Sequence, residues 1–305
     1  MTGPTGTRVI PDRKPRNDEL DVFGITHTGL VRRNNQDHFL TAILGRDLTV
    51  MQTSLGERLP ELPVIPGLPA QERAAFLAVV ADGVGGTAQG EEASRLAVEE
   101  VTSYIARSLH AFYTVDPADD TTFRQALEQA ARQTHEEILR RASDDMARSG
   151  MATTLTLWIG VWPRAWLLQV GDSRYYLLRA GELTQVSRDQ TVAQELIDSG
   201  ALTPGVALRT PWANVLSSAL GGPTNAPTVT HILNDWSTVH LLCSDGLTRH
   251  VPDERIRERL LAMTSSRQVC EDLLQDALEG GGRDNITIVV GRAVPSDHPA
   301  ATAQG

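Results

Sequence analysis

Apolar positions recur along the chain with two different periods. Segments 88–110 and 119–148 place apolar residues at helical spacing with charged residues between them, and 252–279 does so with an interruption near 264–266. This spacing predicts amphipathic helices. Other segments are short, rich in β-branched and aromatic residues and bounded by turn residues, which predicts strands. The expected strands cover 24–29, 37–44, 74–81, 154–162, 165–170, 175–180, 238–243 and 285–290.

The order of these elements predicts one domain of the α+β class. Long helices are grouped in the middle and at the end of a chain of many strands, which favours helices packed on antiparallel sheets. We expect this domain to cover 20–293, with a disordered polar leader at 1–19 and a disordered tail at 294–305. Residues 46–71 contain four prolines and are expected to form an exposed insertion between two strands, which is a candidate binding loop.

The composition excludes several classes of chemistry. The 305 residues carry 28 Lys and Arg against 38 Asp and Glu, a net charge of −10. This balance argues against a nucleic-acid partner, because neutralising phosphates requires basic patches. Lys14 is the only lysine and lies in the leader. The folded part therefore offers no Schiff-base lysine and no P-loop lysine.

The cysteines and the apolar runs indicate the compartment. Cys243 and Cys270 are far apart and form no Cys-x-x-Cys pair, and the N-terminus does not resemble a signal peptide. These features favour a reducing, cytoplasmic setting over a disulfide framework. No apolar run approaches the roughly 20 residues that span a bilayer, so we expect no membrane segment.

Acidic residues stand at the ends of the predicted strands: Asp37, Asp82, Asp172, Asp245 and Asp284. Each has an ordinary explanation when taken singly, because Asp-Gly is a common turn and Asp often caps a helix or precedes a strand. Two near-identical phrases, an apolar strand followed by Asp82-Gly83 or by Asp245-Gly246, suggest instead that two central strands deliver carboxylates to one rim.

Carboxylates gathered at a partly buried rim repel one another unless cations neutralise them. Hard divalent ions prefer such oxygen ligands, and the chain lacks the Cys and His spacing of a zinc finger-like site. The glycine after each acid lets backbone or solvent approach closely, and its carbonyl can serve as a ligand. Two bound metals would generate a hydroxide and hold a phosphate in line without a protein nucleophile.

Seven phrases occur in the order found in the metal-dependent PPM/PP2C-type serine/threonine protein phosphatases, and the chain most resembles the bacterial members. The match extends over about 21–292, nearly the whole folded chain. The phrases are VRRNNQD (31–37), ADGVGG (81–86), GMATTL (150–155), GDSR (171–174), DQT (189–191), CSDGLT (243–248) and GGRDNIT (281–287). The resemblance implies a four-layer αββα sandwich, with two antiparallel sheets flanked by helices and the metals at one end.

The resemblance also implies a role for each acid. Asp82 would bridge two Mn²⁺ or Mg²⁺ ions, and Gly83 would contribute its carbonyl. Asp245 and Asp284 would complete the ligands of the second metal, and Asp37 would hold metal-bound water in the outer shell.

Two further roles follow from the same comparison. Asp172 would share a third, weaker metal with Asp245. Arg32 matches the arginine that grips the substrate phosphate, since a guanidinium fork suits a dianion. A solvated surface charge is the ordinary alternative for Arg32, and Arg33 stands beside it.

The chain departs from the family pattern at several positions. Val84 stands where eukaryotic relatives carry a histidine thought to act as general acid, which leaves the proton donor unassigned. His38 follows Asp37 and is expected to be an ordinary strand residue. Ala152 replaces a glycine of the usual phrase and is expected to be structural. Residues 187–222 resemble the variable flap beside the active site, with a plain surface connection as the alternative.

The resemblance implies an enzyme, a phosphoric monoester hydrolase that removes phosphate from phosphoserine and phosphothreonine in proteins by a hydroxide bound between two divalent metals. Its partners would be phosphoproteins, such as substrates of a bacterial Ser/Thr kinase. One alternative is a catalytically weak or inactive phosphatase-fold module that binds phosphoproteins or a kinase, and the presence of all the core acids counts against it. A two-metal phosphodiesterase acting on nucleic acid is the other alternative, and the net charge of −10 disfavours it.

Overall fold

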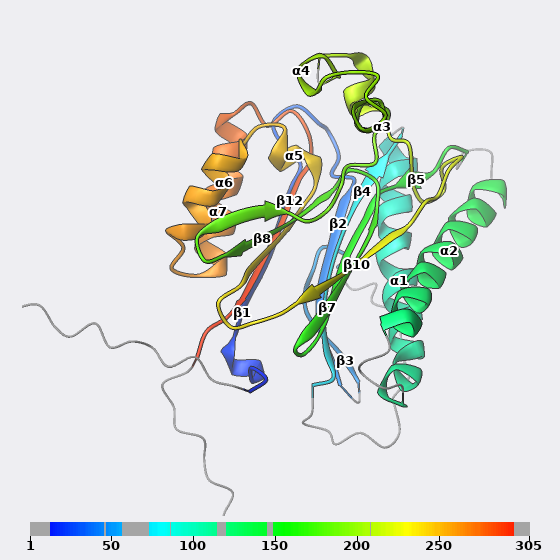
Figure 1. Cartoon of the computed structure of the whole chain (residues 1–305). Helices are drawn as coiled ribbons and strands as arrows, with labels where there is room; N and C mark the ends of the chain where they lie inside the picture. Colours follow the sequence, from blue (N-terminus) through cyan, green and yellow to red (C-terminus); the bar gives the residue numbers. More distant parts are fainter. Residues whose placement is uncertain are drawn as a thin grey trace, which may run out of the picture.

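Two antiparallel β-sheets face each other at the centre of the protein (Figure 1). The computed structural model describes residues 13–45, 47–56, 73–85, 87–114, 120–144, 149–207 and 209–295. The smaller sheet has the order β1 (Leu20–His27), β12 (Ile286–Ala293), β11 (Val239–Cys243), β8 (Arg174–Arg179), β9 (Glu182–Gln185). The larger has the order β10 (Thr228–Leu233), β7 (Arg164–Val170), β6 (Leu155–Val161), β4 (Ala75–Val84), β2 (Asp37–Leu44), β3 (Leu48–Thr53), and β5 (Ala152–Thr153) pairs with β4.

Helices cover the outer face of each sheet. The long helices α1 (Thr87–Thr114) and α2 (Asp120–Asp144) pack on the larger sheet, and α6 (Asp253–Leu261) and α7 (Ser266–Glu279) pack on the smaller one (Figure 1). This arrangement confirms the expected αββα sandwich. Among the residues that the structure describes, no helix is both long enough and apolar enough to span a membrane.

Strand β4 shows why these sequences form the middle of a sandwich. Its side chains alternate, so that Leu77 and Val79 pack in the core beneath α1 while Phe76 and Val80 pack between the two sheets. Because both faces of the strand are buried, the segment is a continuous apolar run and not an alternating one. Asp82 lies near the end of this strand, at the rim of the sandwich.

The expected leader is shorter than the sequence suggested. Residues 13–19 are part of the domain, because Glu19 is buried and forms an ion pair with Arg13. The indole of Trp236 donates a hydrogen bond to the Arg13 carbonyl, and the guanidinium of Arg73 donates to the Pro15 carbonyl. This correction follows from long-range contacts that a local polar composition does not reveal. Residues 1–12 lie outside the described residues.

Part of the expected insertion at 46–71 is also regular structure. Residues 48–53 form the edge strand β3, which pairs with β2 through a register shift between Thr41 and Ala42. Arg46 and 57–72, which include the four prolines, lie outside the described residues. The expected tail begins with two described residues, and Val294 donates a backbone hydrogen bond to Glu19. Residues 296–305 lie outside the description.

The expected flap, 187–222, contains three short helices: α3 (Val192–Asp198), α4 (Pro204–Ala207) and the 3₁₀ helix η3 (Pro211–Asn214). Helices α3 and α4 project beyond one end of the sheets (Figure 1). The base of this segment is closed by backbone hydrogen bonds, from Val192 to Val215 and from Ser217 to Gln190. The flap therefore leaves and rejoins the domain at neighbouring points.

Candidate functional site

Asp37 and Asp82 meet at one rim of the larger sheet. Asp37 is the first residue of β2, and Asp82 lies near the end of β4, directly opposite it in the antiparallel register. In an antiparallel pair, the start of one strand lies beside the end of the other. The two acids are therefore neighbours in space although they are far apart in sequence. The ends of these two strands therefore place Asp37 and Asp82 next to each other at one rim.

Asp245 and Asp284 occupy the matching rim of the smaller sheet. Asp245 is the first residue of the short helix α5 (Asp245–Thr248), just after β11, and Asp284 lies just before β12. Strands β11 and β12 are antiparallel neighbours with Cys243 opposite Ile288, so the end of one meets the start of the other. Arg249 contacts the carboxylates of both Asp245 and Asp284, which places these acids side by side.

Asp37 links the two rims. Its Oδ2 accepts hydrogen bonds from the hydroxyl of Ser244, which directly follows β11, at 2.7 Å, and from that of Thr287 in β12, at 2.8 Å. Its Oδ1 is buried and has no hydrogen-bond partner in the described part of the chain. Ser244 and Thr287 lie in the phrases CSDGLT and GGRDNIT, but nothing in their local sequence predicts contact with Asp37. The sequence around a serine or threonine does not predict a hydrogen bond to a residue on another sheet.

The side chain of Asn285 fixes the loops around the acids. Its Oδ1 accepts the backbone N–H of Gln36 at 2.8 Å, and its Nδ2 donates to the carbonyls of Thr28 and Asn34. The loop that carries Arg32 and the entry to β2 are therefore tied to the start of β12. This role of Asn285 was also missed, although the residue stands within GGRDNIT.

The glycines after the two acids are required by close backbone packing. A Cβ on Gly83 would lie 2.2 Å from the carbonyl oxygen of Gly90, and a Cβ on Gly246 would lie 1.9 Å from the carbonyl oxygen of Asn285. Neither distance is compatible with a side chain. In both Asp-Gly phrases, glycine is required because another backbone segment packs directly against it.

Burial and mutual repulsion disfavour ionisation of the clustered carboxyls. Burial raises the pKa of Asp37 to about 7, with the charges of Asp245 and Asp284 adding to it and two hydrogen bonds opposing it. Burial and then repulsion by Asp37 raise the pKa of Asp82 well above its ordinary value. Burial raises the pKa of Asp245 to about 6, although Arg249 opposes the shift. Cations are needed to keep such a group of acids ionised at neutral pH.

Two arginines supply part of that positive charge. Arg32 donates to Asp284 Oδ2 at 2.8 Å with its side chain about half exposed (49%), and Arg249 lies 3.2 Å from the same oxygen. No three acidic, histidine or cysteine side chains of the described residues already form a complete ligand set. Among the described residues, the buried Oδ1 atoms of Asp37 and Asp245 have no hydrogen-bond partner, so the first can orient a water and the second can accept a cation.

Asp172 lies beside this cluster, on the loop between β7 and β8, and faces a cavity of about 600 Å³. Residues 209–211 and 213–214 of the flap form the opposite wall of the cavity, and Asp245 and Arg249 also line it. Burial, then repulsion by Asp245, raises the pKa of Asp172 to about 7, and Arg249 opposes the shift. The structure therefore brings all five predicted acids to one end of the sandwich.

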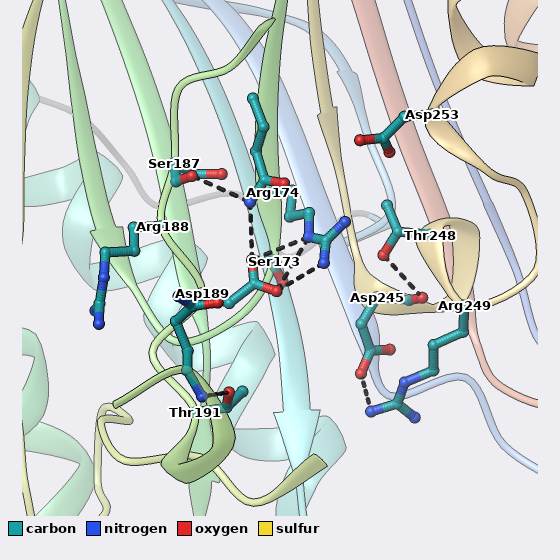
Figure 2. Close-up of polar contacts among 12 residues, drawn as sticks. Ser173, Arg174, Ser187, Arg188, Asp189, Thr191, Asp245, Thr248, Arg249 and Asp253 are labelled. Carbon is teal, nitrogen blue, oxygen red and sulfur yellow. Dashed lines mark hydrogen bonds and ion pairs between the residues drawn. The ribbon is translucent and has the colours of Figure 1, made fainter. Parts of the chain in front are cut away.

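A second ion pair lines the same cavity (Figure 2). Arg174 donates from Nε, at 2.9 Å, and from Nη2, at 2.7 Å, to the carboxylate of Asp189. The hydroxyl of Tyr176 accepts from Arg174 and donates to Asp253. Arg174 and Asp189 stand in the phrases GDSR and DQT, so their ion pair brings these two phrases together in space. Sequence analysis assigned neither residue a role.

Other expectations concern residues that take no part in the cluster. Cys243 is buried, and burial raises its thiol pKa to about 12, which keeps it unreactive. The imidazole of His38 shares a hydrogen bond of 2.9 Å with Ser94, and burial lowers its pKa to about 4. His38 is thus an ordinary neutral strand residue, as expected. Val84 is partly exposed (37%) and brings no proton donor to the rim.

Comparison with known proteins gives a consistent result. The family model described as "Protein phosphatase 2C" matches residues 69–279. The serine/threonine protein phosphatase PstP of Mycobacterium tuberculosis is 37% identical over 224 residues, which is 73% of this chain and 41% of PstP. The serine/threonine phosphatase stp of Listeria monocytogenes is 32% identical over 215 residues, 70% of this chain and 83% of stp.

One solved structure is informative about metals. A crystal structure of the PstP catalytic domain in complex with two manganese ions superposes with a TM-score of 0.67, at 32% identity, over 90% of this chain and 99% of that one. The similarity thus extends over the sandwich, including the rim that carries the acids. The match with this chain covers 41% of the full length of PstP, which is less than half.

Proposed function

This chain belongs to the protein phosphatase 2C family, and from that premise we propose that it hydrolyses phosphoserine and phosphothreonine in proteins. The observation that carries the proposal is the meeting of Asp37, Asp82, Asp245 and Asp284 from both sheets at one rim. Burial at this rim raises the pKa of several of these carboxyls, because their ionised forms are unfavourable there. Bound divalent cations would stabilise those ionised forms.

The donor set fits Mn²⁺ or Mg²⁺. The site offers carboxylate oxygens and the carbonyl of Gly83, which suit hard cations, and Asp245 Oδ1 is buried with no hydrogen-bond partner among the described residues. We propose that Asp82, Asp245 and Asp284 would hold the ions and that Asp37 would hold a water beside them. When bound, such an ion pair supplies an activated water and neutralises charge on the phosphate.

The protein's own residues position the reactants. Asp37 is held by Ser244 and Thr287, so its remaining oxygen has a fixed direction in which to orient a water. Arg32 is half-exposed and reaches the acids from a surface loop, which suits a guanidinium that exchanges a carboxylate for a substrate phosphate. Val84 has no acidic proton, so the leaving alcohol takes its proton from another group.

The substrates are proposed to be phosphoproteins, including targets of a Ser/Thr kinase. The cavity of about 600 Å³, which Asp172 and Asp245 line together with residues 209–211 and 213–214 of the flap, is the proposed place for a peptide side chain next to the phosphorylated residue. We keep the cytoplasm as the expected compartment, where the unpaired Cys243 and Cys270 would remain reduced.

Dephosphorylation of a phosphothreonine peptide tests this function. The protein is stripped with EDTA and assayed for released phosphate with no metal, with Mn²⁺, and with Mg²⁺. We expect turnover only when a divalent ion is added back. Binding of the phosphopeptide without turnover in any metal would instead support a non-catalytic binding module, and cleavage of a DNA or RNA oligonucleotide would support a phosphodiesterase.

A further inference from the structure

Arg249 folds back over Asp245 as a consequence of local helix geometry. Helix α5 is only four residues long, and the backbone N–H of Arg249 donates to the Asp245 carbonyl at 2.9 Å. Residues four apart lie on the same helix face, so the guanidinium reaches the Asp245 carboxylate directly (Figure 2). The Arg249 side chain is 35% exposed and that of Asp245 is 12% exposed, which places this contact on the outer side of the acid cluster.

The two oxygens of Asp245 have different surroundings. Arg249 Nη2 contacts Oδ2, whereas Oδ1 is buried and has no hydrogen-bond partner in the described residues. Arg249 Nη1 also lies 3.2 Å from Asp284 Oδ2. The arginine therefore neutralises the outer side of the acid pair and leaves one inner oxygen of Asp245 for a metal.

Asp172 belongs to the same outer side. It lines the flap cavity together with Asp245 and Arg249. A cation shared by Asp172 and Asp245 would have to use the Asp245 oxygen that is left after the inner ions are bound. That oxygen is the one that Arg249 holds.

We infer that Arg249 is a tethered cation that takes the place of a third metal ion between Asp172 and Asp245. This inference rests on the proposed two-metal function and departs from the third, weaker metal that the sequence led us to expect. A guanidinium attached one turn away has a high effective concentration at the carboxylate, and a divalent ion beside it would meet like-charge repulsion. The protein therefore binds two divalent ions and not three.

Metal counting tests the inference without relying on activity. The full chain is stripped with EDTA, and Mn²⁺ binding is followed by isothermal titration calorimetry, with equilibrium dialysis and metal analysis as a second count. We expect two ions per chain for the unmodified protein and three for Arg249→Ala. Arg209→Ala is the matched control, because Arg209 lines the same cavity from the flap side, and we expect two ions for it.

A double variant identifies the location of the extra ion. Arg249→Ala combined with Asp172→Asn is expected to return the count from three ions to two, since the third ion would need Asp172. Three ions on the unmodified protein, or two on Arg249→Ala, would overturn the inference while leaving the proposed core pair intact. Fewer than two ions on the unmodified protein would overturn both.

Discussion

Asp37 and Asp82 face each other across the β2–β4 pair, with hydroxyls from the other sheet fixing one oxygen of Asp37. Placing two carboxylates opposite each other in a buried register is unfavourable, because like charges across a strand pair destabilise a sheet. The arrangement therefore indicates a site whose charge is completed by cations.

Asp82→Asn should abolish metal-dependent turnover and preserve the fold. The change removes the ligand proposed to bridge the ions, and loss of that charge should lower kcat by at least about a hundredfold. It also removes a carboxylate whose ionisation is opposed by Asp37 and Asp245. The melting temperature in EDTA at pH 8 should therefore be equal to or higher than that of the unmodified protein. Asp47→Asn, at an exposed position, serves as the control and should change neither quantity.

The metal-free protein should lose stability as pH rises. The folded-state pKa values of Asp37 and Asp172 are about 7 and that of Asp245 is about 6, all above the ordinary value of an unfolded chain. A raised folded pKa gives stability that is fully present below the unfolded value and is lost as pH rises through the folded value. Thermal melting in EDTA should therefore show a falling melting temperature between about pH 4 and pH 8.

Excess Mn²⁺ should remove or reverse this trend, because metal binding requires deprotonated carboxylates and favours the folded state at higher pH. Asp37→Asn should weaken the pH dependence in EDTA. An EDTA-treated protein that is more stable at pH 8 than at pH 5 would contradict the described electrostatics.

Gly246→Ala should destabilise the protein strongly. Its Cβ would lie 1.9 Å from the Asn285 carbonyl oxygen, and relief of that overlap requires the backbone at Asp245 or Asn285 to move. We expect a loss of about 1–3 kcal/mol in the free energy of unfolding, measured by urea denaturation. Gly205→Ala in α4 is the control, since a Cβ there meets nothing within 4 Å. An equal effect of the two changes would show that close packing at Gly246 is not what requires glycine.

Arg32→Ala should impair use of phosphopeptides without changing the metal count. If the guanidinium grips the phosphate, its removal should lower kcat/KM by about 10- to 100-fold, because charge-assisted pairs are among the stronger polar contacts. Arg33→Ala is the matched control, at the neighbouring exposed position. Similar kinetics for the two variants would indicate that Arg32 only balances the charge of Asp284.

Local patterns predicted the elements that are buried on both faces. The strands before Asp82 and Asp245 are continuous apolar runs, because both of their faces are buried in the sandwich. The helical spacing of 252–279 predicted α6 and α7, and its interruption near 264–266 predicted the break between them. Strand β10 was not predicted, because it is an edge strand whose side chains are mostly exposed and carry little apolar pattern. An edge strand of this kind forms because it pairs with β7, and this pairing leaves little apolar pattern in its sequence.

The identities of the five acids could be predicted, whereas their partners could not. Ser244 and Thr287 reach Asp37 from 207 and 250 residues away in the chain. No sequence spacing encodes which sheet faces which, so a contact between two sheets becomes visible only in the fold. Arg249 is different, because its spacing of four from Asp245 was present in the sequence and its significance depended on knowing that Asp284 lies beside it.

Anomalous diffraction at the manganese edge, from crystals grown with Mn²⁺, tests the central claim most directly. The account predicts two strong peaks at the rim where β2, β4, β11 and β12 meet, with Asp82 in contact with both and Asp245 and Asp284 in contact with one. Peaks elsewhere on the protein, or an empty rim with ordered arginine–carboxylate pairs at saturating Mn²⁺, would contradict it.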